Sequence, residues 1–310
     1  MTPVSTAPVR NRPYLRELAE GIHAYIQPPG GWCVSNSGII AGEDGAIVVD
    51  SLATEQRTLA LKEAVDALTP SSRRTVVNTH HHGDHVFGNH LFGPDTTVVA
   101  HELTRVEMAE TGLALTKLWP DVDWGDVRVT LPDVTFEERL TLRVGGRRVE
   151  LIHVGPAHTT SDVVVWIEEE GVLFAGDVLF SGSAPFVLMG SVAGSLSAVE
   201  TLTRLEPRTI VCGHGEVTGP QVLEETGAYL SWIEWMAAEG TARGLSPLEM
   251  AEAADTERFD HLLEQERIVG NLHRAYAERL PGVLGRPLDV EAVFGEMVQY
   301  NDGRLPTCLA

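Results

Sequence analysis

Four residues with metal-ligating side chains fall within six positions of the chain. The segment 79–85 reads T-H-H-H-G-D-H, and its ligand-type residues are His80, His82, Asp84 and His85. Imidazole and carboxylate are the side chains that zinc-like ions prefer. In a loop that leaves a strand, His80 and His82 can face one point, and Asp84 and His85 can face a second point nearby. A polar surface loop is the simpler alternative, but four ligand types in six positions favour a metal site.

Three more ligand-type residues follow predicted strands further along the chain. His158 stands in I-H-V-G-P-A-H-T-T, Asp177 follows L-F-A-G, and His214 follows I-V-C-G. In each case a glycine stands between the strand and the ligand, and glycine lets the backbone turn sharply and approach an ion closely. Alone, each motif is typical of an ordinary turn. Together with the first motif they complete a set of seven ligands for two metal ions.

Strands and helices alternate along the chain, and the strands place the ligand-type residues at their ends. Short β-branched or apolar runs predict strands at 22–26, 34–40, 46–50, 75–78, 96–100, 139–144, 147–154, 162–168, 172–175 and 209–212. Helical spacing predicts helices at 54–68, 102–115 and 195–205, the first of them capped by Thr54. Two batches of strands, each followed by helices, favour an α/β architecture of stacked sheets with helices outside.

The last ninety residues differ in pattern from the rest. From Pro220 onward the apolar spacing is almost entirely helical, and no Pro/Gly/Ser-rich linker precedes it. We therefore expect a catalytic core over residues 1–219 and a helical extension over 220–310 that packs on this core. The sequence leaves open whether the extension covers the site or forms a homodimer interface.

Composition excludes several classes of partner. The 310 residues include 23 Lys and Arg against 44 Asp and Glu, a net charge of −21, which repels the phosphates of nucleic acids. No run approaches the ~18 apolar residues of a membrane span, and residues 1–12 lack the apolar stretch of a signal peptide. Three scattered cysteines favour a reducing compartment. We expect a cytoplasmic protein that binds neither nucleic acid nor membrane.

The seven ligands and their spacing resemble those of the metallo-β-lactamase superfamily over residues 22–215. The resemblance implies an αββα sandwich with a helical C-terminal extension and two divalent metal ions, expected to be Zn²⁺, at one edge. It also implies two ligand sets with Asp177 between them, namely His80, His82 and His158 for one ion and Asp84, His85 and His214 for the other. We expect Asp84 and His214 to act in catalysis as well, with Asp84 able to take a proton.

The identity of Asp177, which lies between the two ligand sets, helps to decide which branch of this superfamily the chain resembles. In one branch of the β-lactamases, the position that matches Asp177 carries a cysteine ligand. Other β-lactamases lack a bridging aspartate. Thioesterases of the glyoxalase II type keep the aspartate, but they need basic residues for glutathione, and the C-terminal part of this chain has no clear lysine cluster. Two further functions stay open. One is a plain two-metal hydrolase of a thioester, lactone or lactam, and the other is a non-catalytic metal-binding scaffold.

Several segments resemble the second-ring cyclases of aromatic polyketide biosynthesis, of the actinorhodin type. They are GGWCVSN at 30–36, TGLALT at 111–116, WP at 119–120, VDWG at 122–125, GSVAG at 190–194 and LPTCLA at 305–310. The resemblance implies intramolecular aldol condensation and dehydration, which close a second ring of a poly-β-ketone held on an acyl carrier protein. The resemblance is also compatible with hydrolysis of the thioester at the same site.

Such a reactive chain requires an apolar, partly aromatic pocket. The irregular segment 115–124 and the segment 185–192 can supply its walls, together with the loop near residue 32. We expect the lining residues to be Trp32, Cys33, Leu115, Leu118, Trp119, Trp124, Phe186 and Met189. Carrier proteins are usually acidic, so the arginines of the hairpin 139–148 are a candidate docking face. Scattered solvated charge is the alternative interpretation of these arginines.

Overall fold

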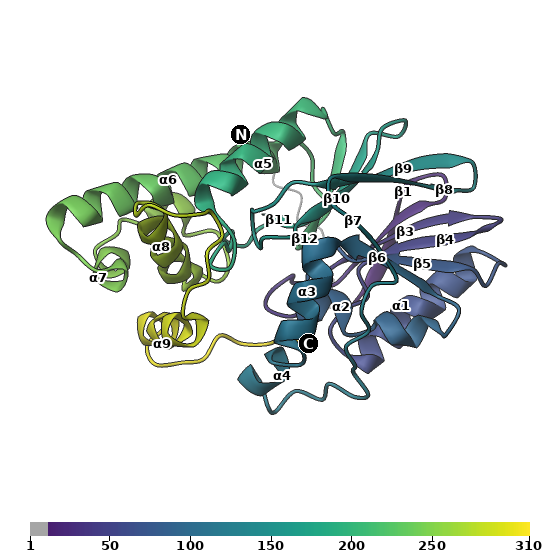
Figure 1. The fold of residues 1–310 in the computed structure, drawn as a ribbon, viewed down its shortest axis with the longest axis horizontal. Helices are drawn as coiled ribbons and strands as arrows, with labels where there is room; N and C mark the ends of the chain where they lie inside the picture. Colours follow the sequence, from purple (N-terminus) through teal and green to yellow (C-terminus); the bar gives the residue numbers. More distant parts are fainter. Residues whose placement is uncertain (1–11) are drawn as a thin grey trace.

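The strands of the chain form two sheets that face each other (Figure 1). The computed structural model describes residues 12–310. The first sheet has its strands in sequence order: β1 (Tyr14–Ala19), β2 (Ile22–Ile26), β3 (Ser37–Gly42), β4 (Gly45–Val49), β5 (Arg74–Val77), β6 (Thr97–His101) and β7 (Val134–Phe136). The second has the order β12 (Thr209–His214), β11 (Val172–Phe180), β10 (Val163–Ile167), β9 (Arg147–His153) and β8 (Arg139–Val144).

Helices cover the outer faces of both sheets. The first sheet carries α1 (Glu55–Leu68), and the second carries α5 (Val192–Arg204). Alternate residues of β4 show why two layers form: Ile47 and Val49 pack between the sheets, whereas Val48 packs against α1. The result is an αββα sandwich with a helical C-terminal region, as predicted.

Short helices and turns connect these layers near the site. They are α2 (Gly83–Val86), the 3₁₀ turn η1 (Asn89–Phe92), α3 (Glu102–Thr111) and α4 (Leu115–Leu118). The helix predicted over 102–115 is wrong at its end, because Gly112 has φ +57° and stops α3 at Thr111. The predicted N-cap of α1 is confirmed, since the Thr54 side chain accepts a hydrogen bond from the backbone N–H of Arg57.

The C-terminal region gathers at one end of the sandwich (Figure 1). It contains α6 (Gln221–Arg243), α7 (Pro247–Glu252), the 3₁₀ turn η2 (Glu257–Phe259), α8 (Arg267–Glu278) and α9 (Val290–Tyr300). Its buried side chains share one apolar cluster with Phe186 and Leu188 from the segment that follows β11. The helices therefore pack on the core through that segment.

The sequence predicts neither a signal peptide nor a membrane-spanning segment. Residues 1–11, which carry most of the segment judged not to be a signal peptide, lie outside the described residues. Within residues 12–310, no helix is both long and apolar enough to cross a bilayer.

The contact between the two sheets generates a stability prediction. A Cβ added at Gly38 in β3 would lie 2.5 Å from Cε1 of Phe174 in β11, so Gly38→Ala overfills the space between the sheets. We expect a loss of about 1–3 kcal/mol in the free energy of unfolding, measured by urea denaturation. The matched control is Gly227→Ala in α6, where the nearest atom is 3.7 Å away and alanine favours the helix. Equal stability of the two variants contradicts the prediction.

Candidate metal centre

The seven predicted ligands converge from both sheets onto one place in the structure. His80 and His82 lie in the loop after β5, Asp84 and His85 lie in α2, and His158 follows β9. Their ligand atoms form three groups, each within 4.8 Å: His80, His82 and His158; His80, His85 and Asp177; and Asp84, His85 and His214. The first and third groups are the two predicted ligand sets. Metal binding by these groups stays a prediction.

Two of the ligands lie in strands rather than after them. The parallel pairing of β11 with β12 continues as far as Phe180 and His214, so Asp177 is inside β11 and His214 is the last residue of β12. Gly176 adopts φ +51°, where the register of β11 shifts. A Cβ at Gly213 would lie 1.8 Å from Oδ1 of Asp177. Gly213 is therefore needed for room beside the carboxylate, whereas Gly176 supplies the bend.

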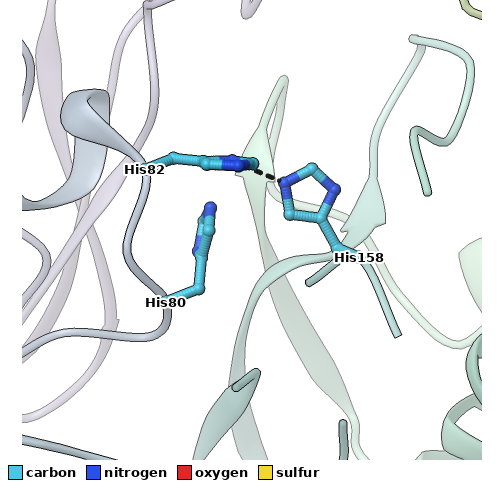
Figure 2. A group of neighbouring side chains, drawn as sticks. All are labelled: His80, His82 and His158. Atoms are coloured by element: carbon cyan, nitrogen blue, oxygen red, sulfur yellow. Dashed lines mark hydrogen bonds between the residues drawn. The ribbon is translucent and has the colours of Figure 1, made fainter. Parts of the chain in front are cut away.

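The first group consists of three imidazole rings that face one another. Figure 2 shows His80 and His82, from the loop after β5, pointing toward His158 on the opposite side. Nε2 of His158 lies 2.9 Å from Nδ1 of His82. Three nitrogen ligands with room for a further ligand suit a divalent ion such as zinc.

The carboxylate of Asp177 joins the two groups. Its Oδ1 lies 3.2 Å from Nε2 of His85, and its Oδ2 lies 3.3 Å from Nε2 of His214 and 3.5 Å from Nε2 of His158. Asp84 completes the other side, with Oδ2 3.4 Å from Nε2 of His214. One side chain thus reaches ligands of both sets, which is the geometry that a bridging carboxylate requires.

The outer nitrogens of four imidazoles are held by the protein. Nδ1 of His80 lies 3.0 Å from the Thr79 hydroxyl, and Nδ1 of His214 lies 3.1 Å from the Gly31 carbonyl oxygen. Nδ1 of His158 hydrogen-bonds the carbonyl oxygen of Phe186. Nδ1 of His85 lies 2.8 Å from Oδ2 of Asp50. Each ring therefore keeps a proton on Nδ1 and directs Nε2 into the site, so that Nε2 offers its lone pair to a metal ion once it carries no proton.

The atoms that face the centre fit a metal ion. Nε2 of His80 and His85 and Oδ1 of Asp177 are buried and make no hydrogen bond. Buried acceptors without partners cost free energy, and a bound cation removes that cost. The donor set, imidazole nitrogen and carboxylate oxygen, matches zinc chemistry.

Asp50 is a functional residue that the sequence analysis missed. It ends the apolar run of β4, adopts φ +65° and is 2% exposed. Its Oδ1 accepts from the Thr79 N–H at 2.8 Å, and its Oδ2 accepts from the Thr79 hydroxyl at 2.8 Å. Asp50 therefore orients His85 directly and His80 through Thr79. A buried aspartate at the end of a strand next to the histidine-rich loop was the available signal.

The charges of the site divide the histidines into two classes. Burial lowers the pKa of His80, His82 and His158. Burial also acts on His214, but the carboxylates of Asp177 and Asp84 outweigh it and raise the pKa of this imidazole to about 9. The same balance raises the pKa of His85, with Asp177 as the largest opposing charge. Burial would raise the pKa of Asp177, yet the adjacent His214 and His85 hold it well below its usual range.

Metal binding should therefore release protons. At neutral pH the metal-free site keeps His214 protonated, because its pKa of about 9 lies above the solution pH, and an ion must displace that proton. We expect the apparent metal affinity to rise with pH by about tenfold per pH unit for each proton displaced, and to level off once both His214 and His85 have lost the proton that the ion displaces. Calorimetric titration with Zn²⁺ in buffers of different ionisation enthalpy measures both quantities. An affinity that does not change with pH contradicts this prediction.

A cavity of about 610 Å³ opens onto the centre. Five of the ligands, His82, Asp84, His158, Asp177 and His214, lie in its wall. The predicted pocket residues that line it are Trp32, Cys33, Leu115, Leu118, Trp119, Phe186 and Met189. The cavity thus joins the candidate metal centre to a mostly apolar space, which is typical of a substrate site.

Trp124 is a correction to the predicted pocket, since it does not line this cavity. Its ring packs edge-on against Phe87 at a centroid distance of 6.1 Å, and its indole N–H donates to the carbonyl oxygen of Trp119 at 3.1 Å. Trp124 is 8% exposed and belongs to the apolar layer behind Trp119. Its role is to support the wall.

The C-terminal region supplies a wall that no local pattern in the sequence indicates. Phe294 and Val298 of α9, Arg267 of α8 and Leu305 of the last segment all line the cavity. The backbone N–H of Leu309 donates to the carbonyl oxygen of Trp32 at 3.0 Å, which holds the end of the chain beside the site. The extension therefore forms part of the cavity wall, and the homodimer interface stays a prediction.

Histidines outside the seven predicted ligands have other partners. Nδ1 of His81 lies 3.0 Å from Oε2 of Glu107 in α3, which braces the loop. His101 and His153 stack at a centroid distance of 3.8 Å. His261 and His273 pair with Glu225 and Glu296. His81 also lines the cavity, whereas the other four are not among its lining residues.

Comparison with known proteins agrees with the geometry. The model of the metallo-beta-lactamase superfamily matches residues 30–214. The chain is 24% identical over 222 residues to the type 2 metallo-beta-lactamase of Bacteroides fragilis, covering 68% of this chain and 83% of that protein. It is 27% identical over 276 residues to the hydroxyacylglutathione hydrolase of Xanthomonas euvesicatoria, covering 85% and 92%. It spans about half (47%) of the length of the hydroxyacylglutathione hydrolase of Methylococcus capsulatus, at 30% identity.

A solved metallo-beta-lactamase from Pontibacter korlensis has the same fold. It superposes with a TM-score of 0.59 at 20% identity, over 71% of this chain and 99% of the other. The family match covers more than half of the chain, and the sandwich and the clustered ligands agree with it. The chain therefore belongs to the metallo-β-lactamase superfamily, whose members are metal-dependent hydrolases that typically hold two zinc ions.

Proposed function

We propose that this protein is a two-metal hydrolase that cleaves a thioester, lactone or lactam in a substrate with a large apolar part. The observation that carries the proposal is the carboxylate of Asp177, which lies 3.2 to 3.5 Å from histidines of both ligand sets at the wall of an apolar cavity. When bound, two divalent ions supply an acidified water and polarise a carbonyl. The relatives in the comparison support hydrolysis as the general class of reaction.

The chain's own residues supply the remaining parts of the reaction. His80, His82 and His158 would hold one ion, and Asp84, His85 and His214 the other, with Asp177 shared. Asp84 lines the cavity and is 8% exposed, so its carboxylate is placed to accept a proton from water at the site or to return one to the leaving group. The apolar wall excludes bulk water from the reacting carbonyl.

Aromatic side chains give the cavity its character. Trp32 lies with ring centroids 5.3 Å from Phe186, 5.9 Å from Phe294 and 5.9 Å from Trp119. Such a cluster favours a flat or extended apolar group beside the carbonyl that reacts.

These walls favour a second candidate function, the ring closure expected from the sequence. A poly-β-ketone on an acyl carrier protein presents flat 1,3-dicarbonyl units, which suit aromatic walls and a pair of metal ions. In that case the centre closes a ring by aldol condensation with loss of water, and hydrolysis releases the product. The hairpin β8–β9 offers a docking face for an acidic carrier, where exposed Arg139 and Arg143 lie on one face of β8.

Mass spectrometry separates the two candidates. The zinc-loaded protein is offered a short thioester mimic of a monocyclic poly-β-ketone and, separately, an aromatic acyl thioester, with chelator-treated controls. Release of free acid from both supports the hydrolase. Loss of one water with the thioester retained supports the cyclase and overturns the hydrolase as the primary reaction. Asp177→Ala and His158→Ala should each lower turnover by more than about a hundredfold, and unchanged turnover in both contradicts the two-metal mechanism.

Substrate size gives a further prediction. Phe294→Ala in α9 removes part of the aromatic wall, and we expect KM for the aromatic thioester to rise about tenfold, because lost apolar contact weakens binding by one to a few kcal/mol. The KM of an acetyl thioester, which does not reach the wall, should stay the same. Val283→Ala, at a side chain 82% exposed, is the matched control. A kcat loss shared by both substrates would show instead that α9 supports the centre.

A further inference from the structure

Two backbone peptide groups connect the metal centre to the C-terminal region. The first is the peptide between Gly31 and Trp32, whose two polar groups have different partners. Its carbonyl oxygen lies 3.1 Å from Nδ1 of His214, and its N–H donates to Oε1 of Glu264 at 2.6 Å. Glu264 stands three residues before the start of α8 and is mostly buried. One peptide unit therefore links a carboxylate of the extension to a histidine of the centre.

The second link has the same construction on the other ligand set. In the peptide between Phe186 and Val187, the carbonyl oxygen accepts a hydrogen bond from Nδ1 of His158. The N–H of the same peptide donates to Oδ1 of Asn271 at 2.9 Å. Asn271 lies in α8 and is 0% exposed, and its amide nitrogen also donates to the carbonyl oxygen of Pro185 at 2.8 Å. The orientation of the Asn271 side chain is therefore fixed by two backbone groups.

A buried arginine holds the first link in place. Arg267, 2% exposed, pairs with Glu264 and donates to the carbonyl oxygen of Ala184 at 2.8 Å. Its guanidinium carbon lies 4.5 Å from the ring centre of Trp32 and 4.7 Å from that of Phe180. Since the charge of Glu264 is compensated and its position fixed, it acts as a rigid acceptor for the Trp32 N–H.

We propose that Glu264 and Asn271 are positioning residues of the metal centre, each acting on one histidine through one peptide group. A hydrogen bond accepted from the N–H polarises the peptide and strengthens its carbonyl as an acceptor. The stronger carbonyl fixes the Nδ1 proton of the imidazole and makes Nε2 a better ligand. Glu264 serves His214, in the set with Asp84 and His85, whereas Asn271 serves His158, in the set with His80 and His82.

The inference rests on the two-metal function proposed above, and cobalt titration tests it without an activity assay. The full-length protein is titrated with Co²⁺, and two binding steps are followed by visible absorption. His214→Ala and His158→Ala identify which step belongs to which ligand set. We expect Glu264→Leu to weaken the step lost in His214→Ala by about 10- to 100-fold, and Asn271→Leu to weaken the step lost in His158→Ala by a similar factor.

Two further variants separate positioning from packing. Glu264→Gln keeps the shape and the acceptor oxygen, so it should restore most of the affinity and the absorption spectrum that Glu264→Leu loses. Glu266→Leu is the matched control, because the Glu266 side chain accepts from the indole N–H of Trp32, at 2.9 Å, whereas the Trp32 backbone N–H donates to Glu264. Its cobalt affinity should equal that of the wild type. If Asn271→Leu does not fold, the Glu264 variants decide the test.

The outcomes distinguish this inference from the proposal on which it rests. A wild type that binds two cobalt ions, with Glu264→Leu and Asn271→Leu binding them equally well, overturns the positioning role alone. Equal weakening of both steps by either variant also overturns it, since general loosening of the fold would then be the cause. A wild type that binds no cobalt overturns the two-metal function itself.

Discussion

The carboxylate of Asp177 imposes the main constraint on this molecule. It is 6% exposed and lies within 3.5 Å of three imidazoles, so its charge must be balanced in a place that water reaches poorly. The surrounding backbone is arranged for it. Gly213 leaves the volume that the carboxylate occupies, and Gly176 bends β11 beside it. Cations at the centre, either protons on His214 and His85 or metal ions, satisfy that charge.

The core and the C-terminal region make different contributions to the site around this carboxylate. Residues of the core supply all seven ligand side chains, and the C-terminal region supplies walls and outer hydrogen bonds. Asp50 contacts its histidine directly because β4 ends beside α2. In residues 12–310, no core carboxylate bonds Nδ1 of His214 or His158, and these Nδ1 atoms meet backbone carbonyls instead. Backbone carbonyls are weaker acceptors than carboxylates, so support from Glu264 and Asn271 has a physical reason at these two positions.

Local patterns predicted the parts of the site that local geometry determines. The spacing of His80, His82, Asp84 and His85 indicates ligands because one loop and one short helix hold all four. The layers were predicted from two batches of short apolar strands, each followed by helices. Asp50 and Phe294 were missed because they meet the site through contacts between distant segments. Trp124 was assigned to the pocket since a buried supporting residue and a lining residue have the same composition in sequence, and only the packing against Phe87 separates them.

The same arrangement limits how the substrate specificity of this chain can change. Arg267 and Phe294 line the cavity, while Glu264 and Asn271 hold backbone that contacts two metal-ligand histidines. All four lie in the C-terminal region, and three of them lie within eight consecutive residues, 264–271. A change that reshapes the wall at Arg267 therefore acts on the partner of Glu264 as well. Among the described residues, no hydrogen bond or ion pair joins α9 to Glu264, Arg267 or Asn271, and Phe294 meets Trp32 and Phe186 through their rings alone. We therefore expect α9 to be the element through which substrate preference can vary with the least effect on the metal geometry.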